Sequence, residues 1–120
     1  MSAYNKAKGS KFESDLESHC NDSGLHARRL PRAGAKDIGD VSITLNSRAV
    51  IVVEAKNVAK ENMADFLRQA EVEAEHYEEK YKSATYPVVA VKARTKHVSQ
   101  ARVTMTLETL ITLLHGEGIA

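Results

Sequence analysis

The sequence lacks several residue types and patterns that would point to common protein classes. Its 120 residues include no Trp, two Pro and a single Cys. Because the lone Cys20 cannot form a disulfide within the chain, a reducing compartment such as the cytoplasm is favoured. No window holds the roughly 18 consecutive apolar residues of a membrane span, and residues 1–13 lack the apolar core of a signal peptide. We therefore expect a cytoplasmic protein with no membrane partner.

Motifs for three common chemistries are also missing. The five His residues show no HxxxH spacing and have no Cys partner, which argues against a zinc site. The chain has no GxxxxGKS/T segment, so it offers no loop for binding nucleoside triphosphates. It shows no nucleophilic triad either. Any catalytic role must therefore come from other residues.

The formal net charge of +1 conceals a segregation of charge along the chain. Residues 26–36 and residues 92–102 are basic without any acid, whereas residues 61–80 between them are strongly acidic. The basic residues of the first segment are Arg28, Arg29, Arg32 and Lys36. A single run of charge is often only a solvated surface, but this alternation predicts one positive and one negative face.

Apolar periodicity and turn signals predict alternating helices and strands. Phe12, Leu16 and Cys20 share one helical face, which predicts a helix over about residues 8–22 with Gly24 as its stop. Strands are predicted at residues 25–31, 41–45, 49–56, 86–94 and 101–106, and further helices at 61–82 and 107–116. The second helix is expected to carry one apolar stripe, with its acids elsewhere.

The predicted order is αβββαββα. Thr106 is expected to be the N-cap of the last helix and Gly116 its C-cap. A long helix between two apolar strands predicts an α/β fold with a mixed sheet flanked by helices. At this length, residues 1–120 are expected to form a single domain.

Three charged side chains are expected to meet at one end of this sheet. Glu54 and Lys56 share a face of one strand, because side chains alternate along a strand. Asp40 precedes the antiparallel partner strand, whose beginning lies beside the end of the first. Two carboxylates there suit a hard cation such as Mg²⁺, and Lys56 can activate a water or neutralise a phosphate. Glu13, at the border of the first helix's apolar stripe, can reach the same corner.

Each of these residues also has an ordinary structural explanation. A Glu-x-Lys pair on a strand is often a surface ion pair worth under about 1 kcal/mol. Asp37 and Asp40 are both suited to turns, which Asp favours. The combination of a helix with a Glu, a basic strand, an Asp and a hairpin ending in Glu-x-Lys is what favours a catalytic site.

This combination resembles the PD-(D/E)XK nuclease superfamily, and within it the archaeal-type and phage-encoded Holliday junction resolvases. The matching segments are GSKFE, ARRLPRAGAKDIGDV, IVVEAKN, RQAEVEAE and YPVVAVKAR, within about residues 9–94. The resemblance implies a restriction-endonuclease-like fold in which Asp40, Glu54 and Glu13 hold Mg²⁺, or Mn²⁺ in its place. It also implies that Lys56 is the catalytic lysine. Gln69 lies where some of these nucleases carry a glutamine near the site.

One position departs from the superfamily pattern. Gly39 precedes Asp40 where the first motif carries Pro, which leaves Asp37 as a rival for the metal. Asp40 is preferred, because Glu54 follows it at the spacing more usual in the superfamily.

The resemblance implies an Mg²⁺-dependent endonuclease that hydrolyses DNA and, within that class, a resolvase of four-way junctions. In such an enzyme, the residues that hold the DNA phosphates would be Arg28, Arg29, Arg32 and Lys36. Two opposed cuts need two sites, so a homodimer is expected, with residues 107–116 as a candidate interface. Their apolar residues are Leu107, Leu110, Ile111, Leu113 and Leu114. A repair or restriction-type duplex endonuclease and a non-catalytic DNA-binding module remain as alternatives.

Overall fold

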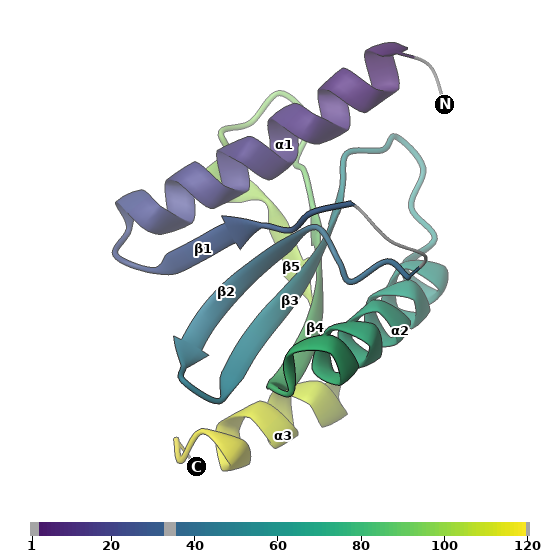
Figure 1. Cartoon of the computed structure of the whole chain (residues 1–120). Coiled ribbons are helices and arrows are strands. Elements are labelled where there is room, and N and C mark those ends of the chain that lie inside the picture. Colours follow the sequence, from purple (N-terminus) through teal and green to yellow (C-terminus); the bar gives the residue numbers. More distant parts are fainter. Residues whose placement is uncertain (1–2, 33–35, 120) are drawn as a thin grey trace.

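The computed structural model describes residues 3–32 and 36–119, and its elements follow the predicted order (Figure 1). The helices are α1 (Ala3–Asp22), α2 (Met63–Tyr81) and α3 (Leu107–Gly116), with a short 3-10 turn η1 (Val98–Gln100). The strands are β1 (His26–Arg29), β2 (Val41–Asn46), β3 (Ala49–Lys56), β4 (Ala84–Val91) and β5 (Arg102–Thr104). Residues 33–35 of the predicted ARRLPRAGAKDIGDV motif lie outside the described residues.

The five strands form one mixed sheet in the order β1-β2-β3-β4-β5. β3 and β4 run parallel and every other neighbouring pair is antiparallel. The parallel pair needs a long crossover, which α2 supplies. The predicted mixed sheet flanked by helices is therefore confirmed.

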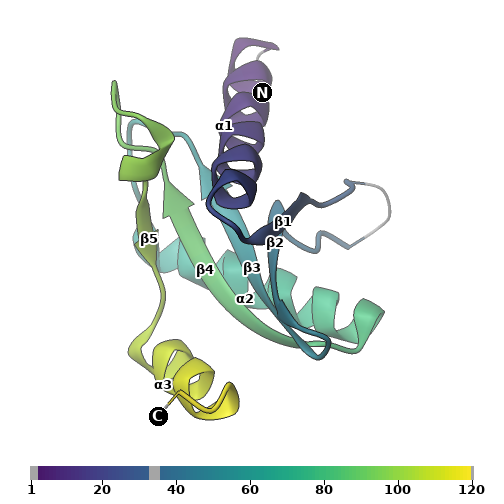
Figure 2. The same ribbon diagram turned by 90° about the vertical axis from the view of Figure 1, so that its left-hand side faces the viewer.

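The two long helices cover opposite faces of the sheet (Figure 2). Phe12 of α1 packs on Val41 and Val53, whereas Ala74 of α2 packs with Val52. Successive residues of β3 therefore face different helices, as alternation along a strand requires. By the same alternation, the side chains of Glu54 and Lys56 lie on the α2 face of the sheet.

Several element boundaries differ from the sequence prediction, among them those of α1, β4 and β5. α1 begins at Ala3 rather than near residue 8. The added residues are exposed and contribute no apolar periodicity, although Ala3, Lys6 and Ala7 among them favour helix. β5 is a short edge strand of three residues. Its length is limited because Thr106, two residues later, caps α3 by accepting a hydrogen bond from the Thr109 amide, as predicted.

The expected C-cap of α3 is wrong by one residue. Gly116 is the last helical residue, Glu117 is the cap and Gly118 has the left-handed φ of 72°. A Cβ on Gly116 would lie 2.5 Å from the Tyr86 hydroxyl, so this glycine is explained by close packing rather than by capping. Tyr86 also donates a hydrogen bond to Glu117 Oε2 at 2.8 Å, which fixes the end of α3 to β4.

Candidate active site

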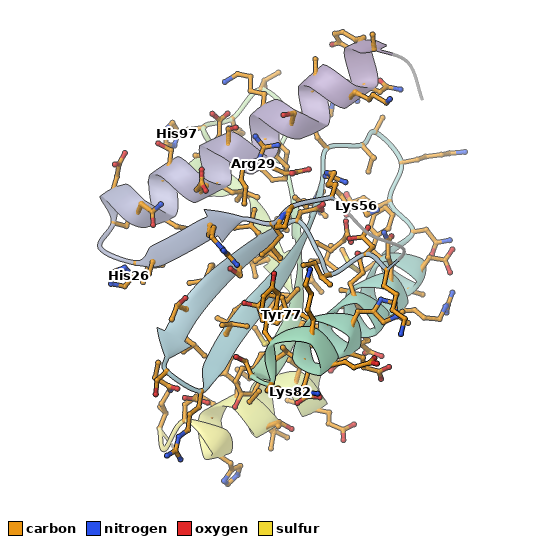
Figure 3. All side chains as sticks on the ribbon, viewed as in Figure 1. His26, Arg29, Lys56, Tyr77, Lys82 and His97 are labelled. Carbon is orange, nitrogen blue, oxygen red and sulfur yellow. The ribbon has the colours of Figure 1, made fainter. Side chains whose placement is uncertain are left out.

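A cleft of about 840 Å³ opens at the end of β3, between α1 and α2. All five residues predicted as catalytic line it, namely Glu13, Asp40, Glu54, Lys56 and Gln69. Figure 3 shows Arg29, from β1, beside α1, and Lys56, from the end of β3, between α1 and α2. The fold therefore gathers residues that are separated by up to 56 positions in the sequence, from Glu13 to Gln69.

The backbone fixes Asp40 at the entry of β2. Asp40 immediately precedes Val41, which pairs with Val53, and the Asp40 amide donates to the Val53 carbonyl at 3.0 Å, so Asp40 lies close to the last residues of β3. The side chain is 3% exposed, and its Oδ2 accepts a hydrogen bond from the Ala55 amide at 2.8 Å. Burial raises the pKa of Asp40, while this hydrogen bond and the charge of Arg32 oppose the rise.

Glu54 holds an incompletely satisfied carboxylate in the same corner. Its Oε1 lies 3.8 Å from the Lys56 ammonium, and its Oε2 is buried without a hydrogen-bond partner. Leaving a buried carboxylate oxygen unpaired is costly unless a further group satisfies it. A hard divalent cation fits this donor set, because Mg²⁺ is usually held by only one or two carboxylates, with waters and phosphate completing its ligands.

Arg32 lies between Glu13 and Asp40 and contacts both carboxylates. The acids Glu13, Asp40 and Glu54 therefore do not converge on one point. The Arg32 guanidinium donates to Glu13 Oε2 and, at 2.8 Å, to Asp40 Oδ1. Arg29 approaches the other Glu13 oxygen at 3.4 Å. Burial and the nearby Asp40 raise the pKa of Glu13, and the two arginines oppose the rise. Among the described residues, no group of three acidic, His or Cys side chains is already arranged to hold a metal ion.

Lys56 is held by contacts on three sides. Its ammonium donates to Gln69 Oε1 at 2.9 Å, approaches Glu54 and lies 4.9 Å from the centroid of the Phe66 ring. The predicted Gln69 therefore contacts the lysine, and through it the site. These contacts restrict Lys56 to one region of the cleft, beside the two carboxylates.

Asp37 also lines the cleft but is used differently from Asp40. Its Oδ1 accepts a hydrogen bond from the Gly39 amide at 3.0 Å, which is the Asx-turn pattern. Its side chain is exposed, and its carbonyl oxygen lies 2.8 Å from Nδ1 of His76. This geometry favours Asp40 over Asp37 as a metal ligand.

The four predicted phosphate-holding residues divide into two groups. Arg29 and Arg32 line the cleft. Arg28 lies between two β1 residues that face α1, so its exposed side chain points to the other side of the sheet. Lys36 lies 3.5 Å from Glu79 of α2, at the surface. Of these four predicted residues, Arg29 and Arg32 are the ones placed to act beside the catalytic candidates.

Glu73 is a notable residue that the sequence reasoning missed. It lies on α2 one turn after Gln69, is 3% exposed, and neither of its carboxylate oxygens has a partner. Burial, followed by the charges of Asp37 and Asp40, raises its pKa to about 8. The expectation that the acids of α2 avoid its apolar stripe is wrong for this residue. The available signal was its position three residues after Ala70 and four before Tyr77, which are both buried.

Comparison with models of known protein families shows which family the chain belongs to. The model of the archaeal Holliday junction resolvase (Hjc) family matches residues 4–114. The chain belongs to the Hjc family. It is therefore an endonuclease that acts selectively on four-way DNA junctions, as the sequence resemblance implied, and nucleases of this kind generally use a divalent metal ion.

A solved structure supports the fold. The chain matches Hjc of Archaeoglobus fulgidus, a Holliday junction resolvase from an archaeal hyperthermophile, with a TM-score of 0.52 and 23% sequence identity. The match covers 80% of this chain and 70% of that one. No match was found among curated protein sequences. Across residues 3–32 and 36–119, no helix is both long and apolar enough to cross a bilayer.

Proposed function

We propose that this resolvase cuts four-way junctions with Mg²⁺ held by Asp40 and Glu54, and with Lys56 as its catalytic lysine. The observation that carries the proposal is the buried, unpartnered Glu54 Oε2 beside Asp40 at the end of the sheet. Mn²⁺ would suit the same oxygen ligands. Glu13 is the third candidate ligand, once Arg32 releases it.

The bound cation would lower the pKa of a water and stabilise the charge that develops on the phosphate. The protein's own side chains position the carboxylates, the lysine and the DNA phosphates. The Ala55 amide fixes Asp40 Oδ2, so the other oxygen, Oδ1, which Arg32 contacts, keeps a constant direction relative to β3. Lys56, oriented by Gln69, neutralises charge on the phosphate or takes part in water activation. Arg29 and Arg32 hold the flanking phosphates of the cut strand.

We also propose that residues 1–120 act as one nuclease domain and that two copies form the working unit. One chain supplies one Asp40–Glu54–Lys56 site, whereas resolution of a junction needs two cuts on opposed strands. A two-fold symmetric dimer places two such sites on a two-fold substrate.

The test compares a labelled four-way junction with a duplex of matched sequence, in Mg²⁺, in Mn²⁺ and with a chelator. We expect Asp40→Asn, Glu54→Gln and Lys56→Ala each to abolish cleavage while junction binding persists, because binding comes from the basic residues. Asp37→Asn is the matched control and should still cut. A variant that cuts at nearly the wild-type rate removes that residue from the mechanism, and an inactive Asp37→Asn beside an active Asp40→Asn would reverse the choice between the two acids.

A further inference from the structure

A second cavity, of about 290 Å³, adjoins the cleft. It lies between the first turns of α1 and the segments that follow β3 and β4. Its lining shares Lys8, Asn57, Val58 and Ala59 with the lining of the cleft. The two cavities therefore share a wall, and the smaller one lies next to the cleft that holds Lys56.

The walls of the cavity combine aromatic and apolar surface. Tyr4 at its rim is 73% exposed, and the Lys8 ammonium lies 5.8 Å from the centroid of its ring. Val58 and the buried Phe12 contribute apolar surface. An exposed tyrosine ring beside apolar side chains offers a surface on which any of the four nucleobases can stack.

The charge of the cavity is strongly positive. Its cations are Lys8, Lys11, Lys92 and Arg94, and Asp15 is its one acid. Asp15 is already paired with Lys11 at 3.1 Å, and no described acid forms an ion pair with Lys8, Lys92 or Arg94. The three unpaired cations suit a phosphate, which positions a nucleic acid without reading its sequence.

We propose that this cavity holds one unpaired nucleotide of the junction, with its base on Tyr4 and Val58 and its phosphate near Lys8, Lys92 and Arg94. The cavity volume of about 290 Å³ suits one nucleotide rather than several nucleotides of a strand. At a branch point stacking is interrupted, so a base leaves the helix there at lower cost than within a duplex. The assignment rests on the proposed function, because it continues the cut strand away from Lys56.

The test measures binding with a chelator present, so that cleavage plays no part. Wild type, Tyr4→Ala, Tyr4→Phe and Tyr81→Ala are titrated against a four-way junction, a matched blunt duplex and single-stranded oligothymidylate. Tyr81 is a matched control, because it is also exposed and has a lysine, Lys80, over its ring, but lies at the end of α2. We expect Tyr4→Ala to weaken binding to the junction and the single strand by about five-fold or more and duplex binding hardly at all.

Tyr4→Phe and Tyr81→Ala should bind as wild type does. Equal affinities of Tyr4→Ala and wild type for the single strand would overturn the proposal, and so would an equal loss on junction and duplex. A wild-type chain that binds junction and duplex equally well would instead refute the proposed function. In that case the affinities of wild type and Tyr4→Ala for the single strand would still test whether the cavity binds a nucleotide.

A photocross-link locates the nucleotide directly. A junction that carries 5-iodouracil at the branch point should cross-link to Tyr4, and one that carries it within an arm should not. Cross-links from both positions, or from neither, would contradict an unpaired nucleotide in this cavity.

Discussion

At the scale of single residues, the buried acids differ in how their charge is compensated. Asp40 accepts hydrogen bonds from a backbone amide and from Arg32, and Glu13 is paired with two arginines. Glu73 has burial comparable to theirs and neither kind of partner. Since burial without a partner favours the neutral form, Glu73 holds a proton in the folded chain at pH values where the unfolded chain has released it.

A pH dependence of stability follows from Glu73. Its pKa rises from an ordinary 4.5 to about 8, so the folded state binds the extra proton between these values. The free energy of unfolding should therefore fall as the pH rises through this window, by at most about 1.4 kcal/mol per pH unit, and the fall should end above the upper value. Urea unfolding at roughly pH 6 and roughly pH 9, with a chelator present, should show a smaller difference for Glu73→Gln than for wild type. Equal differences would contradict the proton on Glu73.

A second prediction at this scale concerns the glycine before Asp40. Gly39 has a φ of 104°, and a Cβ there would lie 2.6 Å from Val52 Cγ1. We expect backbone strain in Gly39→Ala to lower the free energy of unfolding by about 1–3 kcal/mol, and the clash with Val52 to add to this loss. The variant should also impair cleavage, because it shifts Asp40. Gly9→Ala is the control, because a Cβ at this helical position meets open space and should stabilise α1 by about 0.5–1 kcal/mol. Denaturant unfolding measures both, and an unimpaired Gly39→Ala would show that the turn tolerates a side chain.

At the scale of elements, the sequence predicted the fold and that the candidate residues gather in one cleft, because both depend on local patterns. The alternation in β3 placed Glu54 and Lys56 on one face, and the hairpin register brought Asp40 beside them. The Arg32 bridge between Glu13 and Asp40 was not predictable, because side-chain partners across a loop leave no periodic signal. The burial of Glu73 was missed for a related reason: an acid on an apolar stripe contradicts the usual pattern.

The direction of the β1 side chains gives a prediction about DNA binding. Arg29 and Arg32 line the cleft, whereas Arg28 faces away from α1. Each lost phosphate contact should reduce the slope of log affinity against log salt by about 0.9. We expect Arg29→Ala and Arg32→Ala to flatten the slope for junction binding and Arg28→Ala to leave it unchanged. Fluorescence anisotropy over a salt series measures it, and an equal effect of all three would mean that DNA also covers the opposite side of β1.

At the scale of the whole molecule, α3 is the candidate for contact between two copies. The helix lies at one end of the sheet, mainly against β4 (Figures 1 and 2). Its side chains Leu107, Leu110 and Ile111 are exposed. Exposed apolar side chains gathered on one helix are typical of an interaction surface.

We expect Ile111→Glu to convert a dimer into a monomer and to replace paired cuts by single nicks, because a buried charge opposes association. Light scattering at micromolar concentration and a supercoiled cruciform substrate measure the two effects. Val72→Glu is the control, since Val72 is similarly exposed but lies on α2. A monomeric wild type that still makes paired cuts would contradict the proposed dimer. If Ile111→Glu remains a dimer, the interface does not include this part of α3.

The bridge that Arg32 forms has a consequence for the order in which the protein meets its ligands. Arg32 carries the positive charge that Glu13 and Asp40 need when no other cation is present, and its side chain is 60% exposed. Under the proposed function, DNA phosphates that drew this guanidinium outward would free the two acids for a metal ion, and a metal ion on the acids would free the guanidinium for DNA. Such an exchange would make the two binding events cooperative, and the factor by which each strengthens the other would be the same. The nuclease would then be assembled chiefly on its substrate, which limits cutting by the free protein.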